Sequence, residues 1–241
     1  MLGRSHTISG LAAASICLTL NPQPVPTIIA TTALVAGAAI APDLDHSGAT
    51  ISRSLPPLTK VVSHGVNIIS GGHRKGTHSV VGWLILGALA YFASLWHVTI
   101  PEIDSAVLTI HETTLNMGAG LLIGFMAGIA LAALHLDPGG IPGWFVAAGM
   151  AIMGFLVAMN PLIIAACMAG GAAVHSVAGD MLTTEGVPLL YPFITTNLRV
   201  PILGDTGSTR EKAYVISLTV VAIAFPIIYY IGWPMLMSHL G

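Results

Sequence analysis

The sequence predicts an all-α polytopic membrane protein of about seven helices, with an interfacial amphipathic helix on the cytoplasmic side. The first reason is composition: 8 basic and 10 acidic residues make up 7% of the 241 residues, against about 25% in an ordinary soluble chain. Hydrophobic residues make up 54%, and the mean hydropathy is +0.85. These values exclude the soluble, nucleic-acid-binding and disordered classes. The other two reasons are the length of the apolar runs and the distribution of basic residues between them.

Seven apolar runs are expected to form spanning helices, because a segment in a bilayer must satisfy its own backbone hydrogen bonds. A span needs about 20 apolar residues, or fewer where interfacial groups flank it. Asn21-Pro22-Gln23-Pro24 forms a turn between the first two runs, and Asn160-Pro161 separates the fifth from the sixth. The runs cover residues 7–20, 25–41, 80–96, 115–134, 144–159, 162–177 and 213–231.

The basic residues predict a multi-pass protein of the cell (inner) membrane with a cytoplasmic N-terminus. With that orientation, the inner segments hold all 8 Lys and Arg residues and the outer segments hold none. Arg4 followed by an apolar run also fits a signal peptide, but the residues before Asn21 offer no good small-x-small cleavage site. The inner segments are 1–6, 42–79, 135–143 and 178–212.

Residues 57–70 predict an amphipathic helix on the inner membrane surface. Apolar residues recur there with helical spacing, and polar residues occupy the other side. The apolar positions are Leu58, Val61, Val62, Gly65, Val66 and Ile69. With no repeat or separate soluble domain, residues 1–241 are expected to form a single integral membrane domain.

Three glycines at intervals of four, Gly120, Gly124 and Gly128, give the fourth run a face that another helix can approach closely. Packing against a helix of the same chain is the preferred interpretation. A contact between copies of the chain, and so an oligomer, is the alternative.

The ionisable residues collect at the predicted cytoplasmic ends of the helices, where four chain segments bring imidazoles and carboxylates to one depth. A carboxylate in hydrocarbon costs about 2.5–3.5 kcal/mol on insertion scales, so such groups need partners or a function. Imidazole and carboxylate ligands suit a divalent metal, zinc first and manganese or iron as alternatives. The candidate ligands are His6, Asp43, Asp45, His46, His73, His78, His175 and Asp180.

The sequence Asp43-Leu44-Asp45-His46 presents three of these candidates on one short turn. Two carboxylates that close repel each other unless a cation lies between them, and a bridging Asp is typical of a di-nuclear site. The alternative is a polar helix end with solvated charges.

Residues 72–79 contain two histidines and a basic pair. Thr77 is expected to cap the third span, with His78 in its first turn, and His73 lies on the preceding loop. Arg74 can bind a phosphate through two hydrogen bonds, or it can serve only to orient the chain in the membrane. Orientation is the preferred role for Lys75.

His175 and Asp180 are five residues apart, which places them about 140° apart on a regular helix. They can converge only if Gly179 ends or distorts that helix. His6 opens the first helix in the same layer, as a ligand or as a plain interfacial histidine.

Together these motifs resemble the YdjM-like family of LexA-regulated inner-membrane metal-dependent hydrolases, and an early histidine, here His6, also fits. The resemblance covers residues 1–80 and about 175–203. The motifs that carry it are Pro42-Asp43-Leu44-Asp45-His46, Gly72-His73-Arg74-Lys75-Gly76-Thr77-His78-Ser79 and Asp180-Met181-Leu182-Thr183-Thr184-Glu185-Gly186-Val187-Pro188-Leu189-Leu190-Tyr191-Pro192.

The resemblance implies a helical membrane protein with a His/Asp metal site, distantly similar to zinc-dependent phospholipase C. The family pattern has a His four residues before the Asp, whereas Ser176 holds that position here and His175 precedes it. Residues 115–160 look like an extra helical hairpin relative to shorter members.

The sequence therefore predicts a metal-dependent hydrolase that acts on a phosphoester of a lipid or lipid-linked substrate at the cytoplasmic membrane face. Asp43 and Asp45 are the candidate catalytic carboxylates, and Arg74 would hold the anionic group. Membrane lipid is the expected partner, and nucleic acid is not. A transporter or metal-handling membrane protein would place ionisable groups near the bilayer midplane, and a non-catalytic membrane scaffold would need no metal; both remain alternatives.

Overall fold

The computed structural model describes residues 1–104, 109–136 and 141–232, and the chain is mostly helical over these ranges. Each predicted apolar run, and the predicted amphipathic segment, forms a helix. The helices are α1 (Gly3–Leu20), α2 (Val25–Ala38), α3 (Leu58–Ile69), α4 (Val80–Ser94), α5 (Met117–Ala133), α6 (Ile141–Leu156), α7 (Pro161–Val177) and α8 (Thr209–Ile227), continued by a π-helical turn (Ile228–Gly232).

Short 3-10 helices connect the long helices at one end of the bundle. They follow α2 and α7 and precede α4, which are the places where the sequence collects its histidines and aspartates. They are η1 (Ala41–Asp45), η2 (Ile51–Arg53), η3 (Gly76–His78) and η4 (Asp180–Leu182).

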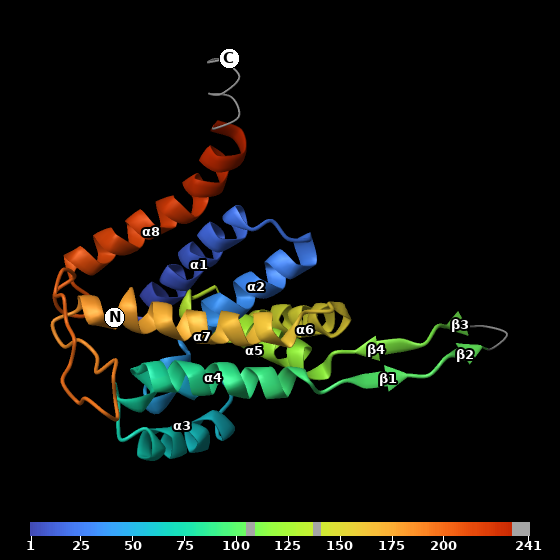
Figure 1. Ribbon diagram of the computed structural model, residues 1–241, viewed down its shortest axis with the longest axis horizontal. Helices are drawn as coiled ribbons and strands as arrows, with labels where there is room; N and C mark the ends of the chain where they lie inside the picture. The colour runs from blue at the N-terminus through green and yellow to red at the C-terminus, as the bar shows by residue number, and fades with distance from the viewer. Residues whose placement is uncertain (105–108, 137–140, 233–241) are drawn as a thin grey trace.

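The predicted outer loop 97–114 contains a β-hairpin that extends away from the helices (Figure 1). The β-branched residues that flank the loop favour extended backbone. Thr99 and Thr114 lie opposite each other, with their hydroxyl oxygens 3.2 Å apart. The strands pair antiparallel as β1 (Val98–Ile100) with β4 (Thr113–Leu115), and β2 (Ile103–Asp104) with β3 (Thr109–Ile110).

Among the described residues, two helical segments are long and apolar enough to cross a membrane, Pro161–Leu182 and Thr209–Gly232. The number of crossings and the side of the N-terminus therefore stay predictions. The shorter apolar helices are Val25–Ala38, Val80–Ser94, Met117–Ala133 and Gly143–Leu156.

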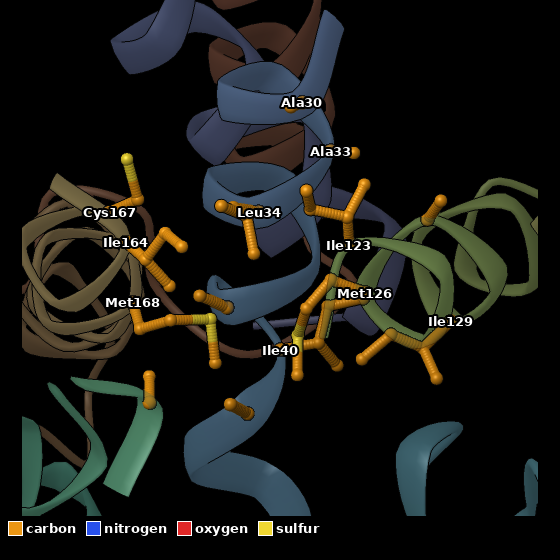
Figure 2. Packing of buried hydrophobic residues seen from close by; sticks show 14 of the residues in the cluster. Ala30, Ala33, Leu34, Ile40, Ile123, Met126, Ile129, Ile164, Cys167 and Met168 are labelled. Carbon is orange, nitrogen blue, oxygen red and sulfur yellow. The ribbon is translucent and has the colours of Figure 1, made fainter. Parts of the chain in front are cut away.

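The hydrophobic core forms around α2, which lies between α5 and α7 (Figure 2). Leu34 of α2 is fully buried and faces Ile123 of α5 and Ile164 of α7. The backbones come unusually close, because a Cβ atom at Gly37 would lie 2.4 Å from the carbonyl oxygen of Met126. This contact fixes α2, and with it η1, relative to the rest of the bundle.

The glycine face of α5 packs against α6 of the same chain. A Cβ atom at Gly120 or Gly124 would lie 2.7 Å from the carbonyl oxygen of Ala151 or Ala147, respectively. A Cβ atom at Gly128 would meet the Trp144 ring at 2.8 Å. The close approach that these glycines predict is therefore made within the chain.

Helix α3 turns its polar side toward the protein and its apolar side outward. The Thr59 hydroxyl donates to the Ser52 carbonyl at 3.0 Å, and the Asn67 amide donates to the Asp45 carbonyl at 2.7 Å. On the other side, Val61 is 70% exposed and Ile69 is 88% exposed. This orientation is unfavourable in water and is the one expected of a helix that lies on a bilayer.

The contact between α2 and α5 makes a test of the core. Gly37→Ala should lower the free energy of unfolding by about 1–3 kcal/mol, because the added methyl group must separate two backbones. Thermal unfolding of the detergent-purified protein measures this. Gly149→Ala in α6 is the matched control, since nothing lies within 4 Å of a Cβ atom there; equal stability of the two variants would contradict the packing.

Candidate metal centre

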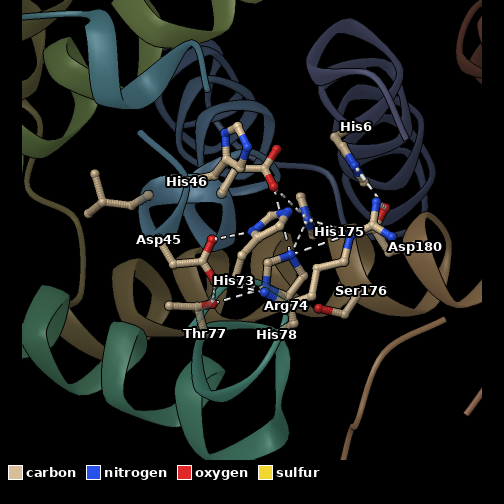
Figure 3. Close-up of polar contacts among 12 residues, drawn as sticks. His6, Asp45, His46, His73, Arg74, Thr77, His78, His175, Ser176 and Asp180 are labelled. Carbon is tan, nitrogen blue, oxygen red and sulfur yellow. Dashed lines mark hydrogen bonds and ion pairs between the residues drawn. The ribbon is translucent and has the colours of Figure 1, made fainter. Parts of the chain in front are cut away.

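Four separate segments place five ionisable side chains around one point at the end of the bundle (Figure 3). The side chains of His78, His175 and Asp180 are almost completely buried, as is that of His6. Two overlapping groups could each hold a metal ion. They are His6, Asp43 and His175, and His78, His175 and Asp180, and the ligand atoms within each group lie within 4.8 Å of one another.

Four of the ligand atoms, from two histidines and two aspartates, lie close together. The Nε2 atoms of His78 and His175 are 3.0 Å apart, and each lies 3.5 Å from Asp180 Oδ2 and 3.7 Å from Asp43 Oδ1. Zinc binds such ligands at about 2.0–2.2 Å, which puts neighbouring ligand atoms of a tetrahedron about 3.3 Å apart. The donor types, and the distance of each carboxylate oxygen from the two Nε2 atoms, are compatible with a divalent ion such as zinc.

The hydrogen bonds of the two histidines turn both Nε2 lone pairs toward this point. His175 Nδ1 lies 2.8 Å from the Ala39 carbonyl oxygen and so donates its proton there. The Thr77 hydroxyl donates to Asp45 Oδ2 at 2.6 Å, so its oxygen accepts from His78 Nδ1 at 2.9 Å. Two lone pairs that face each other at 3.0 Å require a proton or a cation between them.

The charge states around the point agree with this requirement. Burial alone would lower the pKa of His78, but hydrogen bonds with Asp180, Asp43 and Asp45 raise it to about 10. Burial opposes ionisation of Asp43, yet His175 and His78 hold the pKa of that carboxyl well below its usual value. The carboxylates are thus ionised at neutral pH, and a metal ion would take the place of the proton on His78.

His6 adds two ring nitrogen atoms to the centre, and its Nε2 lies 3.4 Å from Asp180 Oδ1. Its ring stacks on that of His175, with centroids 3.6 Å apart and planes 13° from parallel. Neither of its ring nitrogens, nor Asp180 Oδ2, makes a hydrogen bond with any part of the chain that the structure describes. Asp180 Oδ2 still has an ion-pair partner in Arg74 Nε at 3.3 Å. A buried imidazole without any hydrogen bond is rare, so the two His6 nitrogens point to a ligand.

Asp180 reaches His175 because the helix between them ends. Helix α7 stops at Val177, and η4 begins at Asp180, so the angle of a regular helix does not apply. A Cβ atom at Gly179 would lie 2.2 Å from the His175 carbonyl oxygen and 2.7 Å from His6 Nδ1. Gly179 is therefore the residue that lets His6 and α7 approach each other.

Asp45 lies behind His78 and outside the two ligand groups. Its carboxylate accepts from His73 Nδ1 at 2.7 Å, from the Arg74 backbone N–H at 3.0 Å and from the Thr77 hydroxyl. Burial raises the pKa of Asp45, but the hydrogen bonds from His73, His78 and Thr77 lower it by more, so the net shift of the pKa is downward. Asp45 thus holds the loop and the ring of His78 in place.

The structure does not bring His46 and His73 into the ligand groups. Both side chains are exposed, and their rings are 4.7 Å apart at a polar pocket of about 200 Å³. His46 Nδ1 accepts from the Gly48 backbone N–H at 3.1 Å.

Arg74 lies at the edge of the centre with a positive φ of 58°. Its Nε is 3.3 Å from Asp180 Oδ2, and Nη1 donates to the exposed carboxylate of Glu185. The sequence motifs contain Glu185 but gave no sign of this ion pair, which depends on how the loop after η4 folds back.

The predicted cap of α4 is wrong by two residues. Ser79, not Thr77, is the N-cap, and its side chain accepts from the Gly82 N–H at 3.2 Å. His78 consequently lies in η3, before α4, rather than in its first turn. The reason is tertiary, because the Thr77 hydroxyl is engaged by Asp45.

Substitutions of ligands and of supporting residues should lower metal affinity to different extents. His175→Ala should abolish stoichiometric binding of zinc, whereas Asp45→Ala should weaken it by about 10–100-fold, because Asp45 only orients His78. Elemental analysis and zinc titration of the purified variants measure this. His46→Ala is the matched control and should bind zinc like the wild type; equal loss in all three variants would refute the assignment.

Gly179 gives a second test of the centre. Gly179→Ala should displace the His6 ring and lower zinc affinity, because the added methyl group would overlap it. Gly170→Ala, also in α7, is the control because nothing lies within 4 Å of a Cβ atom there. Zinc titration and thermal unfolding are measured together, and unchanged affinity in Gly179→Ala would show that His6 is not a ligand.

Comparison with known proteins identifies one family. No curated protein and no solved structure matches the chain significantly. The family model of the YdjM inner membrane protein matches residues 1–138, which is more than half of the chain and includes His6, η1 and η3. The match supports a location in the inner membrane, and the chain belongs to the YdjM inner membrane protein family.

Proposed function

We propose that the chain is a metal-dependent hydrolase that cleaves a phosphoester of a lipid or lipid-linked substrate at the cytoplasmic face of the inner membrane. The observation that carries this proposal is the set of two imidazole nitrogens and two carboxylate oxygens, in which each oxygen lies 3.5–3.7 Å from both nitrogens. Structural zinc sites in soluble domains commonly use thiolates, whereas His/Asp sets are typical of catalytic ions.

Each residue has a distinct part in this proposal. His78, His175, Asp43 and Asp180 would hold the ion, with His6 beside them. When bound, the ion would lower the pKa of water and polarise a phosphoryl oxygen. Of the four proposed ligands, Asp43 has the most exposed side chain, at 16%, so substrate and water would approach beside it.

Arg74 and Asp45 support a phosphoester as the substrate. The guanidinium of Arg74 lies beside Asp180 and would supply positive charge for the phosphate at the edge of the centre. Asp45 keeps the Nδ1 proton of His78 in place through Thr77, so that the Nε2 lone pair stays directed at the ion. The outward apolar side of α3 supports a substrate that resides in the membrane.

The test is hydrolysis of phosphatidic acid in detergent micelles, with release of inorganic phosphate as the readout. We expect a chelator to abolish release and zinc to restore it. Asp43→Asn should reduce the rate by about 100-fold or more, since loss of a ligand exceeds the usual effect of a supporting residue. His46→Ala should retain the wild-type rate.

Two results would contradict the proposal. In the first, the zinc-loaded protein hydrolyses neither phosphatidic acid nor other phospholipids but moves metal ions across liposome membranes. This result indicates a transporter. The other is wild-type behaviour of Asp43→Asn in every assay together with no bound metal, which indicates a scaffold.

A further inference from the structure

An apolar groove of about 460 Å³ lies beside the metal centre, outside the ligand set. Its volume is within the usual range of small-molecule sites, about 300–1,000 Å³. Four parts of the chain form its walls: η1, α3, the start of α4 with η3, and the loop at 191–192. The lining residues that matter below are Pro42, Leu44, Val66, Ile69, Thr77 and Ile85.

The wall between the groove and the metal centre is very thin. In η1, Pro42 and Leu44 line the groove, while Asp43 belongs to a ligand group and Asp45 supports His78 through Thr77. Thr77 lines the groove and also donates its hydroxyl hydrogen to Asp45. A ligand at this end of the groove would therefore lie within one side chain of the metal centre.

Three of the four residues with hydroxyl groups that line the groove already contact other groups of the protein with them, and the fourth is Tyr191. The Ser79 hydroxyl donates to the Gly76 carbonyl at 2.7 Å and accepts from Gly82, and the Thr77 hydroxyl donates to Asp45. The Ser70 hydroxyl contacts two carbonyl oxygens, each at 3.3 Å. A peptide would leave backbone groups unpaired in such a groove, whereas a hydrocarbon chain would not.

At its other end, the groove opens onto the apolar outer surface of the protein. Ile69 of α3 is 88% exposed, and Ile85 and Leu89 of α4 are 55% and 63% exposed. From Ser79 to Leu89 the α4 wall is about 15 Å long at 1.5 Å per residue. The lining thus continues without a polar barrier into surfaces that a membrane would cover.

We propose that this groove holds one fatty-acyl chain of a membrane phospholipid, with the phosphate at the end formed by η1 and η3. The inference rests on the proposed function, because it names the substrate class of the same centre. The acyl chain would enter the groove from the bilayer between α3 and α4. The phosphate of the same lipid would then lie next to the candidate metal centre.

The test uses native mass spectrometry of the full chain, released from detergent and titrated with dipalmitoyl phosphatidic acid in the presence of a chelator. Ile85→Trp and Val66→Trp fill the groove from opposite walls and should weaken lipid retention at least tenfold. Leu84→Trp is the matched control, because Leu84 is a neighbour on α4, 64% exposed and outside the groove lining. It should retain lipid like the wild type.

Glycerol 3-phosphate, which lacks the acyl chains, should not compete with phosphatidic acid. Equal retention by Ile85→Trp, Val66→Trp and Leu84→Trp overturns the proposal, and so does stronger retention of a polyprenyl phosphate than of phosphatidic acid. Lipid retention by the chelated protein, together with no hydrolysis by the zinc-loaded protein, supports the groove and refutes only the catalytic proposal. Hydrolysis that is unaffected by Ile85→Trp and Val66→Trp refutes only the groove.

Discussion

Two carboxylates and two imidazole lone pairs, all directed at one buried point, are stable only if positive charge lies among them. Removing such groups from water costs several kcal/mol each unless they are paired. Asp43 and Asp180 approach His78 and His175 to within 3.5–3.7 Å, so the elements that carry them, η1, η3, α7 and η4, are held together by that shared charge. The Met1 ammonium and the Arg74 guanidinium, both paired with Asp180, and a proton on His78 supply part of it, and a divalent ion would supply more. Cation binding and the docking of these segments are therefore coupled.

The apolar bundle determines where this charge can be shared. Helix α2 packs on α5 at Gly37 and on α7 at Gly171, where a Cβ atom would lie 2.6 Å from that of Ala38. Because η1 follows α2 almost directly, these backbone contacts fix Asp43 against α7. The hydrogen bond from His175 to the carbonyl of Ala39 then locks the same two elements at the level of the centre. Substitutions far from any ligand can thus change the geometry of the ligands.

The helices could be predicted from the sequence because apolar runs between Pro, Gly and Asn have few other ways to satisfy their backbone. The segments that carry the ligands could be predicted as well, since His and Asp are scarce in so apolar a chain. The partners of each side chain could not. Whether Asp180 reaches His175 depends on the end of α7 at Gly179, and the choice of Ser79 over Thr77 as the α4 cap depends on a contact with Asp45, 32 residues earlier. Such contacts are set by tertiary packing, which local spacing does not record.

Helix α3 and η1 together explain how a polar centre can serve a hydrocarbon surface. The polar side of α3 holds η1 through the hydrogen bond from Asn67 to the Asp45 carbonyl, while its apolar side faces outward. In η1 itself, neighbouring residues divide between the groove and the metal centre. An ion site that is closed off deep in the bundle would exclude lipid. A site that is fully open to the membrane would bring hydrocarbon into contact with buried charges. A wall one residue thick, anchored by the amphipathic helix α3, keeps the two environments separate and still adjacent, which is the arrangement that the proposed chemistry on a lipid phosphate would require.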